Sequence, residues 1–276
     1  MNKYIVAVSG GIDSVVMLDI LARQKDYELI VAHFDHGIRD DSHLDAEFVE
    51  GLAKKYGLKF ESKREELGQK ASEELARDRR YKFLREIAGK YSAKIVTAHH
   101  IDDVVETIAI NLLRGTGWRG LAVLDSDITR PLTDKTKSDL IEYAKINNLS
   151  WREDSTNLGD KYLRNQVRKK LAKLNDDFKF QLLGLWAEQK ALKNKINEEV
   201  SNLIGDGPGY SRYFLTHVGD KVAVELLRHI TSAKLTRPQI IKLLHAIKTI
   251  AAGKTYSAGG VKVSFTSRNF TVELLK

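Results

Sequence analysis

Cysteine is absent from this chain of 276 residues, and its absence narrows the chemistry that the protein can perform. Without thiols there can be no disulfide bond, no cysteine-ligated zinc and no transfer of sulfur through a persulfide. No window approaches 18 apolar residues, so we expect no membrane-spanning segment. Internal repeats and low-complexity segments are also missing. Met1-Asn2-Lys3 leads directly into an apolar stretch, so we expect no signal peptide and a cytoplasmic location.

The composition is that of a globular protein, with 42% hydrophobic and 30% charged residues. The length allows one large domain and a smaller one. A net charge of +8 suggests a polyanionic partner. Residues 160–195 hold ten Lys and Arg against four Asp and Glu. Such a run is usually a solvated helix face, but its concentration here favours contact with a phosphate backbone.

The most informative stretch is Ser-Gly-Gly-Ile-Asp-Ser at 9–14, which lies between a buried strand at 4–8 and an apolar-striped helix. A glycine-rich turn that enters a helix N-terminus suits an anion, because backbone N–H groups and the helix dipole point at it. Ser9 and Ser14 add hydroxyl donors. Asp13 would repel a phosphate unless a divalent cation lies between them. The stretch therefore predicts a phosphate site with a metal ion, and an ordinary glycine turn is the alternative.

Strand and helix patterns alternate along the first part of the chain. We expect strands at 4–8, 29–34, 58–61 and 94–98, and helices at 15–24, 41–56, 71–91 and 104–115. This alternation predicts an α/β fold, a parallel sheet with helices on both faces. Polar clusters follow three of the strands, at 9–14, 33–39 and 98–103. Because ligands bind beyond the carboxyl ends of such strands, the three turns should converge on one cleft.

Two of these clusters contain candidate ligands or catalytic groups. His33 and His36 have the spacing of a metal-binding pair, but a structural role is equally open on spacing alone. Asp103 and Glu106 are three residues apart and share one face near a helix N-terminus, where acids are favoured by the dipole in any case. The functional alternative is ligation of a divalent cation beside the phosphate. His99 lies at a strand end, where it would face the phosphates.

The pattern changes after residue 147. We expect a basic helix at about 161–173, a long helix at about 179–204 and a linker at 205–209. Two helices at 220–231 and 237–251 follow, and Thr236 should cap the second. Period-two alternation at 261–265 and 270–274 predicts a β-hairpin. The expected domains are therefore a catalytic domain at 1–175, a connecting helix at 176–204 and a C-terminal domain at 205–276.

The 9–14 loop resembles the Ser-Gly-Gly-x-Asp-Ser loop of the N-type ATP pyrophosphatases, or PP-loop enzymes. Further motifs follow in order: His-x-x-His-Gly-x-Arg at 33–39, Ala-Arg-x-x-Arg-Tyr at 76–81, Thr-Ala-His-His-x-Asp-Asp-x-x-Glu-Thr at 97–107, Arg-Gly-x-Gly-x-x-Gly-Leu at 114–121, Arg-Pro-Leu at 130–132, and Glu-Asp-x-Thr-Asn at 153–157 with Tyr-x-Arg-Asn-x-x-Arg at 162–168. Together they resemble the tRNA(Ile)-lysidine synthetase family over roughly residues 4–170. The helices and hairpin at the C-terminus resemble its tRNA-binding domain more loosely, and longer members have a further domain.

The resemblance implies a PP-loop fold, similar to the adenine-nucleotide α-hydrolases, and a specific ligation. ATP, with Mg²⁺, adenylates the C2 oxygen of the first anticodon base, a cytidine, in the isoleucine tRNA with anticodon CAU. Free L-lysine then attacks C2, AMP leaves, and the product base lysidine pairs with A. The implied partners are this tRNA and L-lysine. No membrane partner is expected, and a homodimer is left open.

The same resemblance assigns roles to individual residues. Those expected to bind the nucleotide are Ser9, Gly10, Gly11, Ile12, Asp13 and Ser14. The expected catalytic residues are Asp13, Arg80, His99, Asp103 and Glu106, with Asp13 and Asp103 as metal ligands. On the side of tRNA or lysine the expected residues are Arg39, Arg77, Arg114, Arg164 and Arg168. From the residues alone, Arg77 and Arg80 would be read as a solvated basic patch.

Three other functions compete with this interpretation. A PP-loop enzyme that thiolates tRNA is disfavoured because such enzymes generally use cysteines or iron–sulfur clusters. A small-molecule ligase, such as an amide-forming one, would not need the basic segment at 160–195. A non-catalytic RNA-binding module would not need the intact 9–14 loop or the acids at 103 and 106.

Overall fold

A computed structural model describes residues 2–37, 41–68, 71–124, 126–152, 163–171, 173–204 and 209–275, with only the backbone described at 163–165. The chain forms two compact units, Met1–Lys190 and Ala191–Lys276, which are described separately below. Among the helices in these described ranges, none has both the length and the apolar composition needed to cross a bilayer.

The first unit is built on a four-stranded sheet in which every strand pair is parallel. The strands are β1 (Asn2–Ala7), β2 (Tyr27–Asp35), β3 (Lys59–Arg64) and β4 (Lys94–Val96). Their spatial order is β3-β2-β1-β4, so the chain moves outward from β1 and then returns to its other side. The loops after β1 and β4 therefore leave the same edge of the sheet next to each other.

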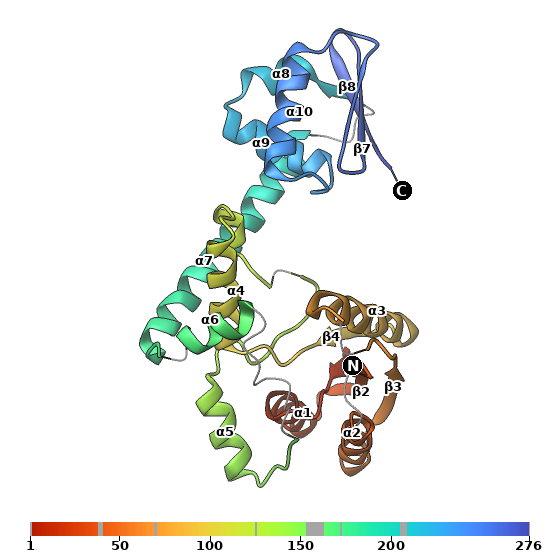
Figure 1. Cartoon of the computed structure of the whole chain (residues 1–276), viewed down its shortest axis with the longest axis vertical. Coiled ribbons are helices and arrows are strands. Elements are labelled where there is room, and N and C mark those ends of the chain that lie inside the picture. Colours follow the sequence, from red (N-terminus) through yellow and green to blue (C-terminus); the bar gives the residue numbers. More distant parts are fainter. Residues whose placement is uncertain are drawn as a thin grey trace. The chain divides into compact units, whose positions relative to one another are not determined.

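Alternating side chains of the central strands build one core on each face of the sheet. Ile5 pairs with Ile30 and Ile95, and these three residues pack on α3 (Glu73–Tyr91). The neighbouring row of Val6, Val31 and Val96 packs on α1 (Ile12–Gln24), α2 (His43–Lys55) and α5 (Lys137–Ile146). Figure 1 shows α3 on one side of the sheet and α1 and α2 on the other.

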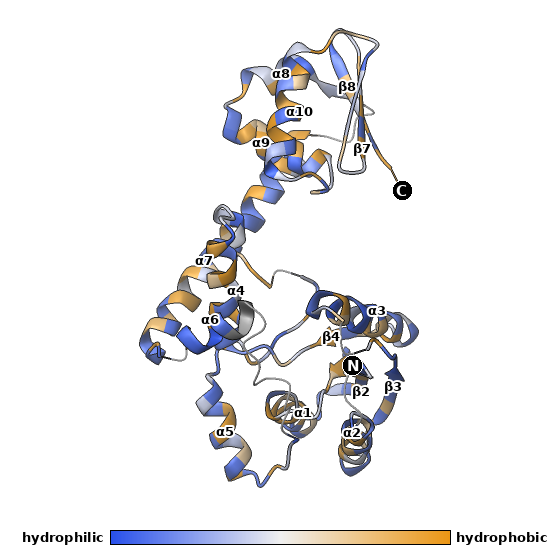
Figure 2. Cartoon of the chain, viewed as in Figure 1, coloured by the Kyte–Doolittle hydropathy of each residue, from blue (hydrophilic) through white to orange (hydrophobic). Residues whose placement is uncertain are grey.

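The two faces are covered by helices of different character. The ribbon of α1 is mostly hydrophobic and that of α3 mostly hydrophilic (Figure 2). This matches their burial, because eight of the 13 residues of α1 are buried but only four of the 19 residues of α3. The prediction of a parallel sheet with helices on both faces is confirmed.

Beyond β4 the chain adds α4 (Ile101–Leu113), the short 3₁₀ helix η1 (Trp118–Gly120), α6 (Leu163–Leu171) and α7 (Asp176–Ile204). Residues 129–132 run parallel to the end of β4, through bridges from Thr129 to Val96 and from Leu132 to His100. Apolar side chains of α4 meet Leu183 and Trp186 of α7. The Trp186 indole donates a hydrogen bond to the Val123 carbonyl at 2.8 Å.

The second unit packs helices against an antiparallel sheet of order β5-β8-β7-β6. The strands are β5 (Tyr210–Ser211), β6 (Thr255–Ala258), β7 (Val261–Phe265) and β8 (Asn269–Leu274), and the helices are α8 (Arg212–His217), α9 (Asp220–Ile230) and α10 (Arg237–Thr249). The predicted hairpin is β7 and β8, with Val263 opposite Val272. Thr236 is the N-cap of α10 as predicted. Helix α8 and strands β5 and β6 were not predicted.

Some predicted boundaries were wrong. Helix α1 begins at Ile12 rather than Val15, so Asp13 and Ser14 belong to its first turn. Helix α7 begins at Asp176, where the Asn175 side chain accepts a hydrogen bond from the Phe178 backbone. Both helices therefore begin before the apolar stripe that the sequence displays, and a polar cap accounts for this in α7. Most of the predicted linker, residues 205–208, lies outside the described residues.

Asp19 generates the first prediction, because its buried carboxylate joins three helices. It accepts hydrogen bonds from Tyr56 at 2.6 Å, Arg23 at 2.7 Å and Tyr143 at 2.8 Å. Replacing Asp19 with Ala leaves two tyrosine hydroxyls without their acceptor, so the free energy of unfolding should fall by about 2–4 kcal/mol. Urea unfolding measures the change. Tyr143→Phe should cost clearly less, and equal costs would contradict the assigned role of the carboxylate.

Candidate functional site

The loop after β1 is closed by its own two serines. The Ser14 hydroxyl donates to the Gly11 carbonyl at 2.8 Å and accepts from the Ser9 backbone N–H at 3.2 Å. Gly10 has φ of +95°, a conformation that side chains disfavour, so the turn needs glycine there. Gly11 is the N-cap of α1, and no side chain of the described chain caps this helix. Backbone donors at the start of α1 are therefore available to an anion.

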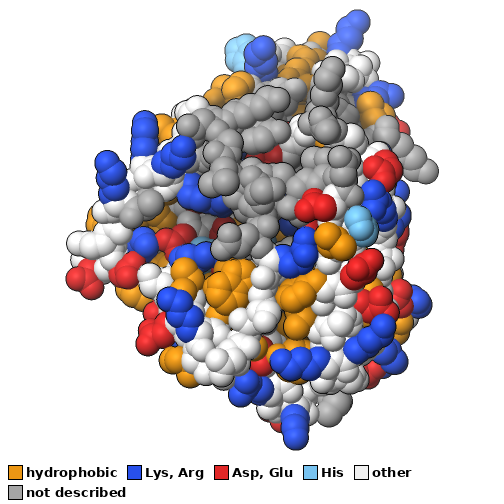
Figure 3. All heavy atoms as spheres, turned by 60° about the horizontal axis from the view of Figure 1, so that its bottom comes forward, with side chains coloured by type: hydrophobic (Ala, Val, Ile, Leu, Met, Phe, Trp, Pro, Cys, Tyr) orange, Lys and Arg blue, Asp and Glu red, His pale blue; other side chains and the backbone are white. Residues whose placement is uncertain are grey.

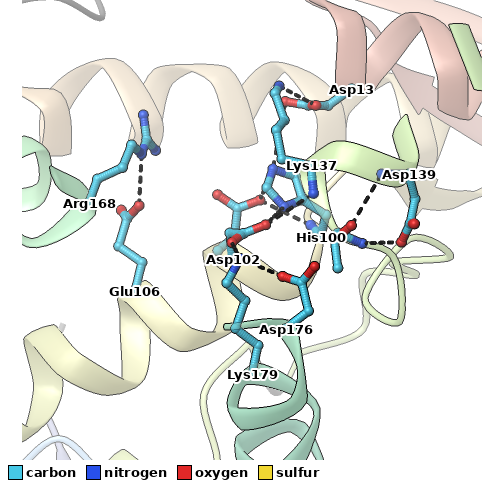
Figure 4. A network of polar contacts seen from close by, with 11 residues as sticks. Asp13, His100, Asp102, Glu106, Lys137, Asp139, Arg168, Asp176 and Lys179 are labelled. Atoms are coloured by element: carbon cyan, nitrogen blue, oxygen red, sulfur yellow. Dashed lines mark hydrogen bonds and ion pairs between the residues drawn. The ribbon is translucent and has the colours of Figure 1, made fainter. Parts of the chain in front are cut away.

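His100 connects this loop to the start of α4. It is the N-cap of α4 and follows β4, the strand that pairs with β1. His100 Nε2 lies 3.8 Å from Asp13 Oδ2 and 3.6 Å from Asp103 Oδ2. Its Nδ1 lies 3.2 Å from Asp102 Oδ2. One imidazole therefore lies among three carboxylates from the first turns of α1 and α4. Figure 4 shows His100 with Asp13 and Asp102 beside it.

The surroundings of the His100 ring explain its protonation. Burial alone would lower the pKa of His100, but the contact with Asp102 and the charges of Asp103 and Asp13 outweigh it and raise the pKa. Burial alone would raise the pKa of Asp102, yet His100 and Lys179 hold it well below its usual range. The acids and the imidazolium therefore stabilise one another as charged groups.

Two lysines complete the network from more distant segments. Lys137, the first residue of α5, places Nζ 2.6 Å from Asp13 Oδ1. Its backbone N–H also donates to Asp102 at 3.2 Å. Lys179 of α7 contacts Asp102 at 2.8 Å and Asp176 at 3.0 Å. The acid cluster is thus bracketed by cations on both sides, as Figure 4 shows.

Glu106 lies one turn further along α4 and has a different partner. Its side chain is 3% exposed, and Oε2 accepts a hydrogen bond from Arg168 Nε of α6 at 3.0 Å. Asp103 and Glu106 are both near the helix start, but Asp103 turns back to its own N-cap while Glu106 faces α6. The structure therefore splits the predicted acid pair between two cationic partners.

His99 lies beside this network and has the opposite protonation behaviour. Burial lowers the pKa of His99, and the negative charge of Asp103 partly opposes this shift. The charges of Arg130, Arg80 and Arg77 lower the pKa further, to about 4. The Thr97 hydroxyl contacts His99 Nδ1 at 2.8 Å. His99 is therefore neutral at physiological pH, whereas its neighbour His100 favours the charged form.

The structure tests where the other predicted residues lie. The charges of Arg77 and Arg80 act on His99 and help to lower its pKa. Arg114 is exposed at the far end of α4, eleven residues beyond Asp103, so the structure does not bring it to the acids. Arg39 and the side chain of Arg164 lie outside the described residues, as do the motif at 153–157 and Tyr162.

His33 has a structural role. It is buried, and its Nδ1 contacts the Val8 carbonyl at 2.9 Å, which fastens the end of β2 to that of β1. The rings of His36 and Phe34 pack in a T-shaped arrangement, with their centroids 4.9 Å apart. Within the described parts of the chain, no group of three or more His, Asp or Glu is arranged to hold a metal ion. The hydrogen bond from the His33 ring supports the structural interpretation of that residue.

Asp13 and Asp103 remain suited to a cation that also has phosphate ligands. Their Oδ2 atoms both face the same ring nitrogen of His100, at 3.8 and 3.6 Å. Mg²⁺ typically uses one or two carboxylates together with substrate phosphates and water. A pair of protein oxygens of this kind fits Mg²⁺ held between the 9–14 loop and a polyphosphate, and does not form a closed protein cage.

Sequence reasoning missed His100, Asp102, Lys137 and Lys179 as members of the site. His100 and Asp102 were inside a recognised motif but were given no role. Lys137 follows the capping residue Thr136, and its sequence surroundings show only the start of a helix. Lys137 lies 124 residues beyond Asp13 in the chain, and nothing in the sequence indicates that the two side chains would meet.

Comparisons with known proteins agree with this geometry. A family profile described as "PP-loop domain" matches residues 1–175. A tRNA(Ile)-lysidine synthase of Rickettsia bellii is 34% identical over 229 residues, covering 77% of this chain and 53% of the relative. One from Thermosipho africanus is 33% identical over 254 residues, covering 83% and 58%. The chain spans about half the length of these relatives. The resemblance drawn from the motifs is confirmed.

The fold also recurs among solved structures. The U34-tRNA thiolase NcsA from Methanococcus maripaludis, with its [4Fe-4S] cluster, superimposes with a TM-score of 0.59 and 17% identity. The match covers 70% of this chain and 73% of the thiolase. At this level of identity the likeness extends to the fold alone.

The pKa values of the adjacent His99 and His100 should be shifted in opposite directions when no divalent cation is added. A raised pKa at His100 stabilises the folded state fully below pH 6.5, the value in the unfolded chain, and this stabilisation is lost as pH rises through the folded value. A lowered pKa at His99 makes stability fall as pH drops from 6.5 towards about 4.

NMR titration of the imidazole protons, assigned with His99→Asn and His100→Asn, measures both values. The His99 signal should stay that of a neutral ring down to about pH 4. The His100 signal should stay that of a charged ring above pH 6.5. If both His99 and His100 had pKa values near 6.5, the result would contradict the geometry of the site.

Proposed function

The chain belongs to the PP-loop domain family, and on that premise we propose that it is an ATP-dependent ligase that modifies tRNA. The substrate is the isoleucine tRNA with anticodon CAU, and the second substrate is free L-lysine. The product carries lysidine at the first anticodon position and decodes AUA. The names of the relatives support this choice of substrate.

The first step transfers AMP from ATP to the RNA. The C2 oxygen of cytidine attacks the α-phosphate, a new oxygen–phosphorus bond forms, and pyrophosphate leaves. In-line attack of this kind depends on positioning and on neutralising the phosphate charge. The backbone donors and hydroxyls of residues 9–14 bind the pyrophosphate portion, and Lys137 at 2.6 Å from Asp13 adds positive charge beside them. Asp13 and Asp103 would hold Mg²⁺, which would neutralise further phosphate charge.

The second step replaces AMP with the amine of lysine. The nitrogen attacks C2, the bond from C2 to the adenylated oxygen breaks, and AMP leaves while the amine loses a proton. Asp103 and Glu106 place negative charge where a cationic amine must bind, and a carboxylate can take up its proton. His99, neutral because burial and three arginines lower its pKa, adds no repulsive charge to the amine.

The target base lies in an anticodon loop, which makes it accessible to such a site. Bases in a loop can be splayed out at a cost of about a few kcal/mol, far less than the effort of opening a long duplex. The protein must then hold the loop through its phosphates. Basic residues near the site and in the second unit would supply these contacts.

The distribution of charge between the units supports an RNA partner. Residues 191–276 hold 13 Lys and Arg against six Asp and Glu, a surplus of seven out of the net +8 of the chain. Residues 1–190 are nearly balanced, because acids elsewhere offset the basic segment at 160–195. The face in Figure 3 accordingly mixes acidic and basic side chains. We therefore assign tRNA binding to the domain at 205–276 as well as to α6.

Thiolation of tRNA is the competing function, since a thiolase shares the fold. The chain contains no cysteine to carry sulfur or to ligate a cluster. The ligase proposal retains the domain limits 1–175, 176–204 and 205–276 and a cytoplasmic location. It does not depend on whether the protein forms a homodimer.

One observation carries the proposal. Asp13 of the 9–14 loop lies beside His100, which follows the strand next to β1 in the sheet. The test mixes the protein with ATP, Mg²⁺, labelled lysine and the CAU tRNA transcript. Label should enter the RNA, and Asp13→Asn should reduce the rate about 10²-fold or more. Asp134→Asn, an exposed aspartate carrying the same chemical change, should retain the wild-type rate. Release of AMP to a different acceptor, without label in RNA, would exclude the proposal.

The basic helix α6 gives a second test. Lys169 and Lys170 are exposed on it, and each should release about one counterion on contact with a phosphate. Replacing both with Gln should flatten the salt dependence of tRNA binding by about two in the log–log slope. The matched control, Lys54→Gln with Lys145→Gln, changes two exposed lysines on α2 and α5. Equal slopes for the two double variants would remove α6 from the RNA interface.

A further inference from the structure

The segment that follows α5 runs back to the 9–14 loop and is fixed against it. Leu149 and Trp151 of this segment pack into the core that α1, α2 and α5 share. The backbone N–H of the next residue, Arg152, donates a hydrogen bond to the Gly10 carbonyl at 3.0 Å. A residue from a distant part of the sequence therefore holds one peptide group of the loop that is suited to a phosphate.

The Arg152 side chain is anchored in turn by acids of α2 and the turn before it. Its Nε donates a hydrogen bond to the Asp45 carboxylate, and a terminal nitrogen lies 4.0 Å from Asp41 Oδ2. The Asp45 side chain is 14% exposed and that of Arg152 is 32% exposed, so solvent screens this ion pair only in part. The pair therefore fastens residue 152, together with the N–H that contacts Gly10, to the start of α2.

The 9–14 loop needs such a restraint because its own backbone is permissive. Gly10 adopts φ of +95°, Gly11 follows it, and glycine loses more conformational freedom on ordering than any other residue. The peptide group that joins them is planar, so a hydrogen bond to the Gly10 carbonyl also fixes the direction of the Gly11 N–H. Because Gly11 is the N-cap of α1, this bond sets how the chain enters the helix end that is available to an anion.

Two neighbouring carbonyls are held in a similar way. The Val8 carbonyl contacts His33 Nδ1 at 2.9 Å, and the Gly11 carbonyl accepts a hydrogen bond from the Ser14 hydroxyl at 2.8 Å. Together with the Gly10 carbonyl, these oxygens are directed at donors of the protein instead of at an incoming phosphate. Of the three contacts, the one to Gly10 depends on a remote segment and therefore on the ion pair that anchors it.

We propose that Arg152 is a positioning residue for the phosphates of ATP, and that Asp45 acts through it. Asp45 holds Arg152, and Arg152 holds the Gly10 carbonyl, so the N–H groups of the 9–14 loop are in place before the nucleotide arrives. Binding then requires less ordering of the loop, which is the general benefit of a preorganised site. The inference rests on the proposed function, since it concerns how the nucleotide of that reaction is bound.

Calorimetric titration with ATP and Mg²⁺ tests this role, because the measurement needs neither tRNA nor lysine. Asp45→Ala and Arg152→Gln should each weaken ATP binding by about 10-fold, since either change releases residue 152 from α2. The double variant should bind within about threefold of the single variants, because both changes act on one contact. Arg152→Lys retains a cation for Asp45 and should recover most of the affinity.

The sign of the Asp45→Ala effect separates positioning from simple electrostatics. Helix α2 borders the loop, because a Cβ at Gly10 would contact Phe48 and Val49 at 3.5 and 3.6 Å. Removing a negative charge beside a site for a polyanion should strengthen binding if charge alone matters. Loss of positioning should weaken it.

The matched control is Arg23→Gln, which breaks an ion pair between a half-exposed arginine and a buried aspartate of α1. Arg23 lies in the last turn of this helix, away from the end that the 9–14 loop enters. The change should lower the free energy of unfolding and leave the ATP affinity within about twofold of wild type.

The alternatives give different results. Unchanged ATP affinity in both single variants would overturn the proposal and leave the ion pair a purely structural role. Weaker binding in Arg152→Gln, with unchanged or tighter binding in Asp45→Ala, would overturn it in favour of direct contact between the guanidinium and a phosphate. If the wild-type protein binds ATP but adds no lysine to RNA, the proposed function fails, while these variants still decide the role of Arg152.

Discussion

The site depends on one contact, the His100 imidazole held among the carboxylates of Asp13, Asp102 and Asp103. The order of the sheet makes this contact, because β1 and β4 are neighbours although the chain travels through β2 and β3 between them. The 9–14 loop and the helix that carries the acids thus emerge side by side. Every role proposed for the 9–14 loop requires that adjacency, since an isolated glycine turn could bind phosphate but could not bring an α-phosphate to a base.

Charge balance stabilises this cluster of acids. Asp13 has Lys137, Asp102 has Lys179 and Glu106 has Arg168, each contributed by a different helix after the sheet. Around His99 the balance reverses, because the charges of Arg130, Arg80 and Arg77 act on this ring. The site thus combines a cluster of acids with arginines nearby, which suits a reaction between a polyanion and a molecule that carries an amine.

Much of the fold could be predicted from the sequence because the signals were local. The apolar runs and the periodic helices gave the parallel sheet, and Thr236 and the alternation around residue 267 gave the C-terminal elements. The 9–14 loop and the acids at 103 and 106 were found through short motifs. Lys137, Lys179 and the split between Asp103 and Glu106 were not, since they depend on packing between helices far apart in sequence.

The central claim is that the nucleotide is transferred to RNA before lysine reacts. Exchange of labelled pyrophosphate into ATP tests this order most directly, because it reports reversal of the first step alone. The account predicts exchange that requires the CAU tRNA and proceeds without lysine. Exchange that requires lysine and proceeds without RNA would mean that the amino acid is adenylated instead, and would contradict the account.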